Sequence, residues 1–212
     1  MSSPSGPPGR VYGGRTATER RAERRIRLLD AGLDAFGTVG WGAVSVERIC
    51  QEASVATRNF YEEYADREAL LLAVYAEVLG AATTAVDLAL SEVPPRMPER
   101  VRAGLSAYVG FVTEDPRRAR VVHREVRVAG VLEDQRRAAF LSFALLVERE
   151  AGAVDRRPGA GRLTALALAG AVNELLIDWV AAAEPRPPVG PVVDELVLLF
   201  VGALTTTPTS TS

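Results

Sequence analysis

The sequence predicts an all-α protein, and three observations support this fold class. Alanine, leucine, arginine and glutamate, all strong helix formers, dominate the 212-residue chain. Apolar residues recur every three or four positions, and no segment alternates in the way that a half-buried strand requires. Glycine and proline gather at the two ends and at a few interior joints, which leaves long segments free to form helices.

The first helix is expected over residues 18–36 and is expected to end at Gly37 and Gly40. The apolar residues expected to be fully committed to its core face are Ile26, Leu29, Leu33 and Phe36. Residues 10–27 contain seven arginines against two glutamates, although the net charge of the chain is -2. The basic charge is therefore concentrated in this helix and in an arm around Arg10 and Arg15, which either enters a minor groove or remains a mobile tail.

A helix-turn-helix is expected between residues 45 and 64. Ser45 can serve as the N-cap of the first of its two short helices, with Glu47 in the first turn. The second helix is expected over residues 57–64, and Asp66 is expected to cap the long helix that follows.

The second helix of a helix-turn-helix lies in the DNA major groove, where its early residues contact base edges. Arginine pairs with guanine, asparagine pairs with adenine, and threonine contacts thymine or phosphate, while tyrosine donates to phosphate. The residues expected to contact DNA on these grounds are Thr57, Arg58, Asn59 and Tyr61. Glu62 and Glu63 are expected to face away, because phosphate repels them. The pattern alone also fits ordinary solvent-facing residues, since a helix-turn-helix pattern is a weak signal.

A series of motifs between residues 24 and 75 strengthens this hypothesis. They are Phe36, "GW" (40–41), "SV" (45–46), "IC" (49–50), "ASVA" (53–56), "FY" (60–61), Tyr64 and "DREALL" (66–71). In this order they resemble the DNA-binding domain of TetR-family transcriptional regulators. The resemblance adds Ser45 and Arg67 to the expected DNA contacts, with Arg67 in place of a phosphate-binding lysine.

Two departures from the family pattern fall in the turn. Ser54 stands where the family usually has glycine, which leaves the turn geometry open. Ala56 stands where a serine usually caps the recognition helix, and Thr57 is expected to replace this cap.

Further helices are expected at residues 98–114, 116–128, 131–153, 160–184 and 190–204. The apolar segment 163–183 approaches membrane-spanning length, but Asn173, Glu174 and Asp178 favour a buried helix of a soluble bundle. The expected domain organisation is a flexible tail (1–18), a three-helix helix-turn-helix DNA-binding domain (19–66), a larger helical ligand-binding and dimerisation domain (67–204) and a disordered tail (205–212).

The resemblance also implies the partners. These are double-stranded operator DNA, an unknown small-molecule effector and a second copy of the chain, which pairs through the last two helices. Those two helices could instead close an intramolecular core. A cytoplasmic repressor is expected, and the segment "EDPRRARVVHREV" (114–126) resembles the family helix that carries effector occupancy to the DNA-binding domains.

An effector cavity needs apolar walls with a few polar anchors, and the middle helices are expected to supply it. The candidate residues are Tyr108, Phe111, Phe140, Phe143, Asn173, Ile177 and Trp179. Val112 and Leu146 are further candidates. His123 is expected to be a surface or partly buried histidine with a satisfied partner rather than a ligand contact.

The chain has one cysteine and one histidine, which excludes an internal disulfide and a Cys/His zinc site. No cofactor, metal or catalytic activity is expected. The alternatives are an all-α enzyme or small-molecule-binding protein with a degenerate helix-turn-helix, and a module that places its basic first helix on acidic membranes. The membrane reading is disfavoured because the apolar residues of that helix are expected to be in the core.

Overall fold

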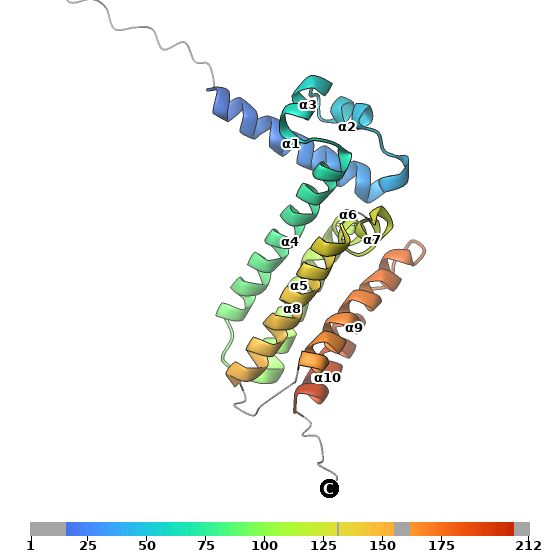
Figure 1. Cartoon of the computed structure of the whole chain (residues 1–212). Helices are drawn as coiled ribbons and strands as arrows, with labels where there is room; N and C mark the ends of the chain where they lie inside the picture. The colour runs from blue at the N-terminus through green and yellow to red at the C-terminus, as the bar shows by residue number, and fades with distance from the viewer. Residues whose placement is uncertain (1–15, 131, 155–161, 206–212) are drawn as a thin grey trace, which may run out of the picture.

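The computed structural model describes residues 16–130, 132–154 and 162–205, and every regular element within these ranges is a helix (Figure 1). The predicted fold class is therefore confirmed. The arm around Arg10 and Arg15, the break predicted at residues 157–159 and the C-terminal tail after residue 205 lie outside the described residues.

The N-terminal half begins with three helices and a short 3₁₀ turn, and continues into a long fourth helix. These elements are α1 (Ala17–Thr38), η1 (Trp41–Ala43), α2 (Val46–Glu52), α3 (Thr57–Glu63) and α4 (Arg67–Ser91). The two predicted caps are confirmed, because Ser45 accepts a hydrogen bond from the amide of Arg48 and Asp66 accepts one from the amide of Ala69. In Figure 1, α4 leads away from the helix-turn-helix into the helical bundle.

The rest of the chain forms that bundle. Its elements are α5 (Met97–Glu114), α6 (Pro116–Arg120), the π-helical turn η2 (Val121–Glu125), α7 (Val126–Ala129), α8 (Glu133–Val154), α9 (Arg162–Ala181) and α10 (Gly190–Thr205). The segment predicted as one helix over 116–128 is thus interrupted by a π-helical turn, a feature that often marks functional sites.

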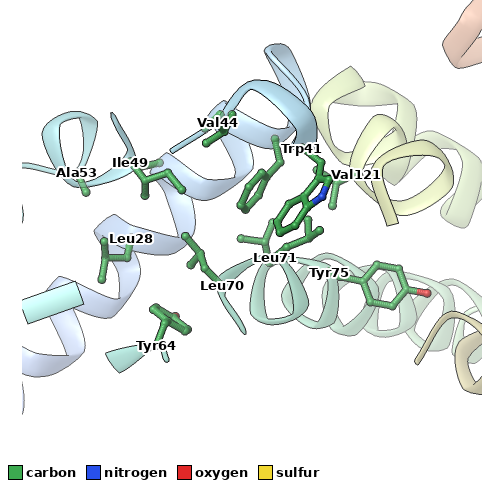
Figure 2. Packing of buried hydrophobic residues seen from close by; sticks show 14 of the residues in the cluster. Leu28, Trp41, Val44, Ile49, Ala53, Tyr64, Leu70, Leu71, Tyr75 and Val121 are labelled. Atoms are coloured by element: carbon green, nitrogen blue, oxygen red, sulfur yellow. The ribbon is translucent and has the colours of Figure 1, made fainter. Parts of the chain in front are cut away.

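The N-terminal core differs from the predicted one on α1. Leu28, Ala35 and Phe36 are fully buried there, whereas Ile26 is 57% exposed and Leu29 is half-buried. The expectation that Ile26 belongs to the core is wrong. The helix-turn-helix and α4 pack on the face of α1 that carries Leu28, Ala31 and Ala35, and Ile26 lies outside this face. Figure 2 shows this core, in which residues of the helix-turn-helix meet the first turns of α4.

The end of α1 also differs from the prediction. Gly37 does not end the helix, which continues to Thr38. A side chain at position 37 would place its Cβ 2.4 Å from the Cβ of Arg117, so this glycine allows α6 to approach α1. Gly40, with a φ of 97°, then provides the turn.

A second core fills the space among α5, α8, α9 and α10. Both α4 and α9 are long and apolar enough to cross a membrane by length and composition alone. Their buried residues, however, take part in the two protein cores, as Leu70 and Val74 do on α4 and Leu176 does on α9. The buried helix predicted at 163–183 is consistent with this arrangement.

Candidate DNA-binding surface and effector cavity

The turn between α2 and α3 keeps its geometry without glycine. Ser54 adopts a φ of 51°, in the left-handed region that glycine favours, and the amide of Val55 donates to the carbonyl of Cys50 at 2.9 Å. Ala56 is the N-cap of α3 and provides no side-chain hydrogen bond. The expectation that Thr57 replaces the missing cap is wrong, because Thr57 is the first residue inside the helix, past the N-cap position.

The two faces of α3 are chemically distinct. Phe60 is fully buried and packs its ring against that of Tyr64, at a centroid distance of 5.8 Å. On the outer face, the side chain of Arg58 is 90% exposed and Tyr61 is 55% exposed. Thr57 and Ser45 are exposed as well, and Asn59 is half-buried at the border. The outer face therefore presents hydrogen-bonding groups on a helix fixed by two buried aromatic rings.

The two glutamates at the end of α3 are placed differently from each other. Glu63 faces α1 as expected: its side chain is only 2% exposed and accepts hydrogen bonds from Arg21 at 3.0 Å and Arg24 at 3.3 Å. Glu62 is half-exposed and lies one turn after Arg58, 3.7 Å from its guanidinium. Its other carboxylate oxygen lies 3.8 Å from the guanidinium of Arg24 on α1. Glu62 therefore lies between the outer face of α3 and α1, and its expected orientation away from DNA stays a prediction.

Arg67 is engaged inside the protein. Its guanidinium donates to the carbonyls of Trp41 and Val44 and lies over the Trp41 ring, 4.0 Å from the centroid. Arg67 thereby fixes the loop that leads to Ser45. Its predicted contact with phosphate stays a prediction.

A cavity of about 600 Å³ lies among α4, α5, η2, α8 and α9. Four of the predicted effector residues, Tyr108, Phe140, Phe143 and Asn173, line it, as does Leu146. Its α4 wall extends from Tyr75 to Asp87, so the cavity is about 18 Å long at the helical rise of 1.5 Å per residue. Exposed residues such as Thr83 and Ser142 lie at its edge, where it opens to solvent.

Three of the predicted effector residues lie outside this lining. Phe111 is covered by the guanidinium of Arg118, 4.4 Å from its ring centroid. Trp179 is buried in the second core and donates its indole N–H to the carbonyl of Pro187 at 2.8 Å. Ile177 is half-buried one turn beyond Asn173. Val112, too, is fully buried core. Aromatic and branched residues at helical spacing pack in cores as readily as they line cavities, so spacing alone did not separate the two.

His123 is both satisfied and part of the cavity wall. It is only 3% exposed, and its ring nitrogens lie 3.3 Å from the hydroxyl of Tyr108 and 3.1 Å from the side-chain oxygen of Asn173. Burial lowers the pKa of His123 to about 4, and burial also raises the pKa of Tyr108. This end of the cavity is therefore uncharged at neutral pH, and its three polar side chains partner one another.

The α4 wall was missed by the sequence analysis. Tyr75, Leu79 and Val86 line the cavity from this helix. Burial raises the pKa of Tyr75 to about 12. The available signal was a tyrosine and two threonines on a helix made mainly of small and aliphatic residues.

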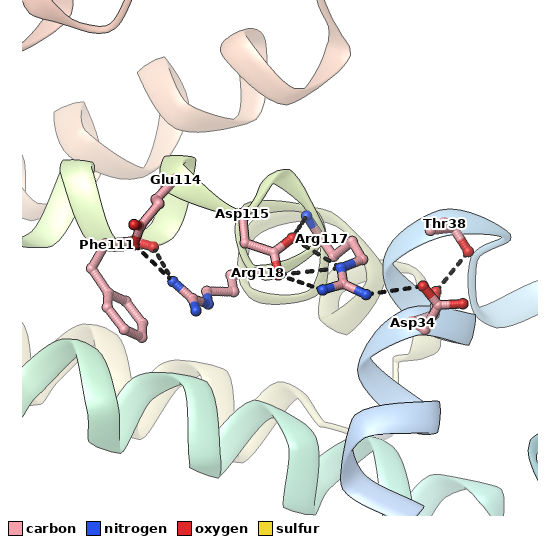
Figure 3. A network of polar contacts seen from close by, with 7 residues as sticks. All are labelled: Asp34, Thr38, Phe111, Glu114, Asp115, Arg117 and Arg118. Atoms are coloured by element: carbon pink, nitrogen blue, oxygen red, sulfur yellow. Dashed lines mark hydrogen bonds and ion pairs between the residues drawn. The ribbon is translucent and has the colours of Figure 1, made fainter. Parts of the chain in front are cut away.

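Two arginines of α6 join this helix to α1. Arg117 donates to Asp34 on α1 at 3.0 Å and to Asp115 at 2.8 Å, as Figure 3 shows. Its hydrogen bonds hold the pKa of Asp115 below the ordinary value. Arg120 donates to the carbonyl of Thr38 at 2.6 Å, the last residue of α1.

The π-helical turn makes a second connection. The carboxylate of Glu125 is buried, accepts from the backbone amide of Trp41 at 2.7 Å and is paired with Arg120 at 2.8 Å. His123, two residues earlier on the same turn, lines the cavity. One turn of helix thus touches both the cavity and the loop that precedes α2.

Within the described residues, no group of three or more histidine, cysteine, aspartate or glutamate side chains is placed to hold a metal ion. Together, the helix-turn-helix and the cavity define the class: a helix-turn-helix protein whose second helical unit contains a cavity large enough for a small molecule.

Comparison with known proteins relates this class to a family. Residues 28–74 match the model of "Bacterial regulatory proteins, tetR family", so the helix-turn-helix domain of this chain is of the type found in TetR-family DNA-binding transcriptional regulators. A comparison with curated proteins gives no match.

Solved structures share the whole fold. The fatty acid degradation regulator FadR from Bacillus halodurans has a TM-score of 0.75 at 17% identity, over 87% of this chain and 97% of its own. A TetR-like regulator from Rhodococcus sp. RHA1 has a TM-score of 0.68 at 24% identity, over 87% and 97%. FadR from Bacillus subtilis, in complex with stearoyl-CoA, has a TM-score of 0.71 at 17% identity, over 84% and 98%.

Proposed function

We propose that this regulator is a homodimeric repressor that leaves a pseudo-palindromic operator when a small-molecule effector occupies the cavity. The observation that carries the proposal is the π-helical turn, which places His123 in the cavity wall and Glu125 against the backbone of Trp41. An effector that favours a different position of this turn shifts the population of dimers that fit DNA, in proportion to its differential affinity. Helix α4 extends from the cavity to the helix-turn-helix and is the proposed lever.

The proposed DNA contacts are Ser45, Thr57, Arg58, Asn59, Tyr61 and Arg67. Arg58 and Asn59 contact base edges, and Tyr61, Ser45 and Thr57 contact phosphates or thymine, because their side chains occupy the outer face of the helix-turn-helix. Arg67 supports this surface by fixing the loop before Ser45, and its charge adds to the attraction for phosphate.

The last two helices are the proposed dimer interface. Large apolar side chains are exposed there, namely Leu163 on α9 and Leu198 and Leu199 on α10. Exposed apolar side chains in one region of a soluble protein support a protein–protein contact. Residues 19–66 are then the DNA-binding domain of a cytoplasmic protein, and residues 67–204 bind the effector and the second copy.

The proposed effector is an elongated molecule with a hydrocarbon chain, such as a long-chain acyl compound. The cavity is long, its walls are mainly aliphatic and aromatic, and its polar triad is satisfied without a ligand. Arg136 lines the cavity near Tyr75, at the end closer to the helix-turn-helix, where a negatively charged head group would compete with Glu133 for its guanidinium. The similarly folded FadR from Bacillus subtilis binds stearoyl-CoA, which supports this class.

The test is binding of purified protein to DNA from beside its own coding region, measured across a salt series. Arg58→Ala is expected to relax the sequence preference, and Tyr61→Ala to weaken binding on every sequence. Each contact contributes about 1–3 kcal/mol if it is direct. Arg96→Ala is the matched control, because Arg96 is an exposed arginine at the start of α5, away from the helix-turn-helix.

Stearoyl-CoA is then added to the protein–DNA complex and is expected to release the protein. Equal affinity for every DNA sequence, or an Arg96→Ala effect as large as that of Arg58→Ala, would contradict the proposed reading surface. Retention of a specific complex at saturating stearoyl-CoA would contradict the proposed effector class and leave the reading surface standing.

A further inference from the structure

A second, smaller cavity lies next to the effector cavity. Its volume is about 60 Å³, and it is enclosed by α4, α5, α8 and α10. Val86, Phe143 and Leu146 line both cavities. These three side chains therefore form a partition between two adjacent spaces.

The two cavities follow the same direction along the bundle. On α4, the large cavity extends from Tyr75 to Asp87 and the small one from Val86 to Leu90. The antiparallel helix α5 agrees, because Tyr108 lines the large cavity and Gly104, one turn earlier, lines the small one. The small cavity thus continues the large one, away from the helix-turn-helix.

The chemistry of the small cavity suits hydrocarbon. Apart from one ion pair, its walls are aliphatic and aromatic side chains and the methionine Met97. The ion pair joins Arg100 and Glu150 at 2.8 Å, and Arg100 also donates to the carbonyl of Leu90 at 2.9 Å, so these charged groups are already paired. A polar ligand group would find no unpaired charge here, whereas methylene groups would find apolar walls.

The partition is made of movable side chains. Phe143 and Leu146 are only half-buried, and they border empty space on both sides. Side chains beside a cavity can change rotamer without displacing a packed neighbour. Opening the partition therefore calls for rotation of Leu146 and of Phe143, whose ring packs against that of Tyr108 with the centroids 5.8 Å apart.

We propose that the small cavity receives the far end of the effector's hydrocarbon chain and so selects for chain length. The inference rests on the proposed long-chain effector. A chain that ends in the large cavity leaves Phe143 and Leu146 in place, and a longer one displaces them. Each further buried methylene is expected to tighten binding roughly three- to fourfold, until the small cavity is filled.

Gly104→Leu tests the proposal by filling the small cavity. A Cβ at this position would lie 3.7 Å from Leu90 and 4.0 Å from Val86, which are ordinary contact distances, so the larger side chain has room to enter. Gly110→Leu is the matched control, because it makes the same substitution on the same helix with nothing within 4 Å of the Cβ. Saturated acyl-CoAs from octanoyl-CoA to stearoyl-CoA are titrated calorimetrically into each protein.

Wild type and Gly110→Leu are expected to bind more tightly with each added pair of carbons. Gly104→Leu is expected to match them for octanoyl-CoA and to bind stearoyl-CoA at least tenfold more weakly. Phe143→Ala removes the partition and provides a test in the opposite direction: the ratio of stearoyl-CoA to octanoyl-CoA affinity is expected to rise.

The outcomes separate this inference from the proposed function. If wild type binds the series and Gly104→Leu weakens all lengths equally or none, the length-selecting role of the small cavity is overturned while the effector class stands. If no acyl-CoA binds wild type, the effector class fails and this inference fails with it. Operator binding and thermal unfolding of each variant check that Gly104→Leu retains the fold.

Discussion

The core of the helix-turn-helix unit and the wall of the effector cavity hold their phenylalanine side chains in different ways. In the first, Phe36 and Phe60 are fully buried, and the candidate binding residues Arg58 and Tyr61 point outward from a filled core. In the second, Phe140 and Phe143 are half-buried because they border a cavity. DNA is read by side chains displayed on a rigid support, whereas a small molecule needs space between helices. Phe60 is therefore expected to contribute mainly to stability, and Phe140 mainly to binding.

The largest expected effect tests this difference with one substitution in two places. Phe60→Ala is expected to reduce the free energy of unfolding by about 3–5 kcal/mol, because it removes a fully buried ring and leaves a void. Phe140→Ala, at a half-buried position beside existing space, is expected to cost less than half as much. Urea unfolding followed by circular dichroism measures both, and equal losses would mean that the two units are packed alike.

A second pair of substitutions tests the contact between the units. Gly37→Ala would place a Cβ 2.4 Å from the Cβ and 2.8 Å from the Cα of Arg117, so α6 must move away from α1. Overpacking of this kind costs about 1–3 kcal/mol. Gly42→Ala, where nothing lies within 4 Å, is the control and is expected to be neutral.

The functional readout of Gly37→Ala is the response to effector. If the α1–α6 contact transmits effector occupancy, Gly37→Ala is expected to bind the operator normally at a temperature where it is folded. Saturating effector is then expected to dissociate a smaller fraction of its DNA complex than for wild type. A variant that responds to effector normally would show that this close contact transmits nothing, and one that is as stable as wild type would contradict the predicted overpacking.

Features of the helix-turn-helix unit could be predicted from the sequence better than features of the cavity. Helix ends follow from local chemistry, and the caps at Ser45 and Asp66 were predicted because an N-cap side chain bonds to amides three residues away. The exposure of Arg58 and Tyr61 on α3 could also be predicted, because Phe60, between them in the sequence, is the apolar residue that faces the core. These features depend on residues close together in the chain.

Features that depend on distant segments were predicted less well. The sequence predicts a helix end at Gly37, but the role of this glycine is set by Arg117, eighty positions later. Tyr75 and His123 join the cavity because four helices converge there, and no local pattern on either helix records that convergence. Trp179 and Phe140 are both aromatic residues inside long helices, yet of the two only Phe140 lines the cavity.

Titration of His123 is expected to change the free energy of unfolding by about 1 kcal/mol between pH 7 and pH 5.5. Its pKa is lowered to about 4 in the folded protein and is about 6.5 when unfolded, so the unfolded state binds more protons between these values. Stability is therefore lost as the pH falls through this window. The expected loss between pH 7 and pH 5.5 is about 1 kcal/mol.

His123→Gln tests the assignment, since His123 is the only histidine in the chain. The variant can still hydrogen-bond to Tyr108 and Asn173 but does not titrate, so its urea midpoint is expected to be nearly flat from pH 7 to pH 5.5. If wild type is equally flat, the ring is not held neutral by burial, and this end of the cavity is more open than the core of the helix-turn-helix.

The smallest expected effect concerns the exposed outer face of α3 in the helix-turn-helix unit. Glu62 shares the outer face of α3 with Arg58 and lies 3.7 Å from its guanidinium. Glu62→Gln removes one negative charge from the proposed DNA surface and frees Arg58, and exposed pairs of this kind are weak. DNA affinity is therefore expected to rise only about two- to threefold at low salt, and the gain is expected to shrink at high salt because it comes from removing one negative charge beside the phosphates.

The control for Glu62→Gln is Glu99→Gln, which breaks a comparable exposed pair with Arg96 at the start of α5. It is expected to leave DNA binding unchanged, so that any gain at Glu62 reflects its position rather than the net charge of the protein. A gain of the same size in both variants would mean that long-range charge alone attracts DNA. No gain in either would place Glu62, and with it the last turn of α3, beyond the reach of the phosphates, leaving base contacts to the first turn alone.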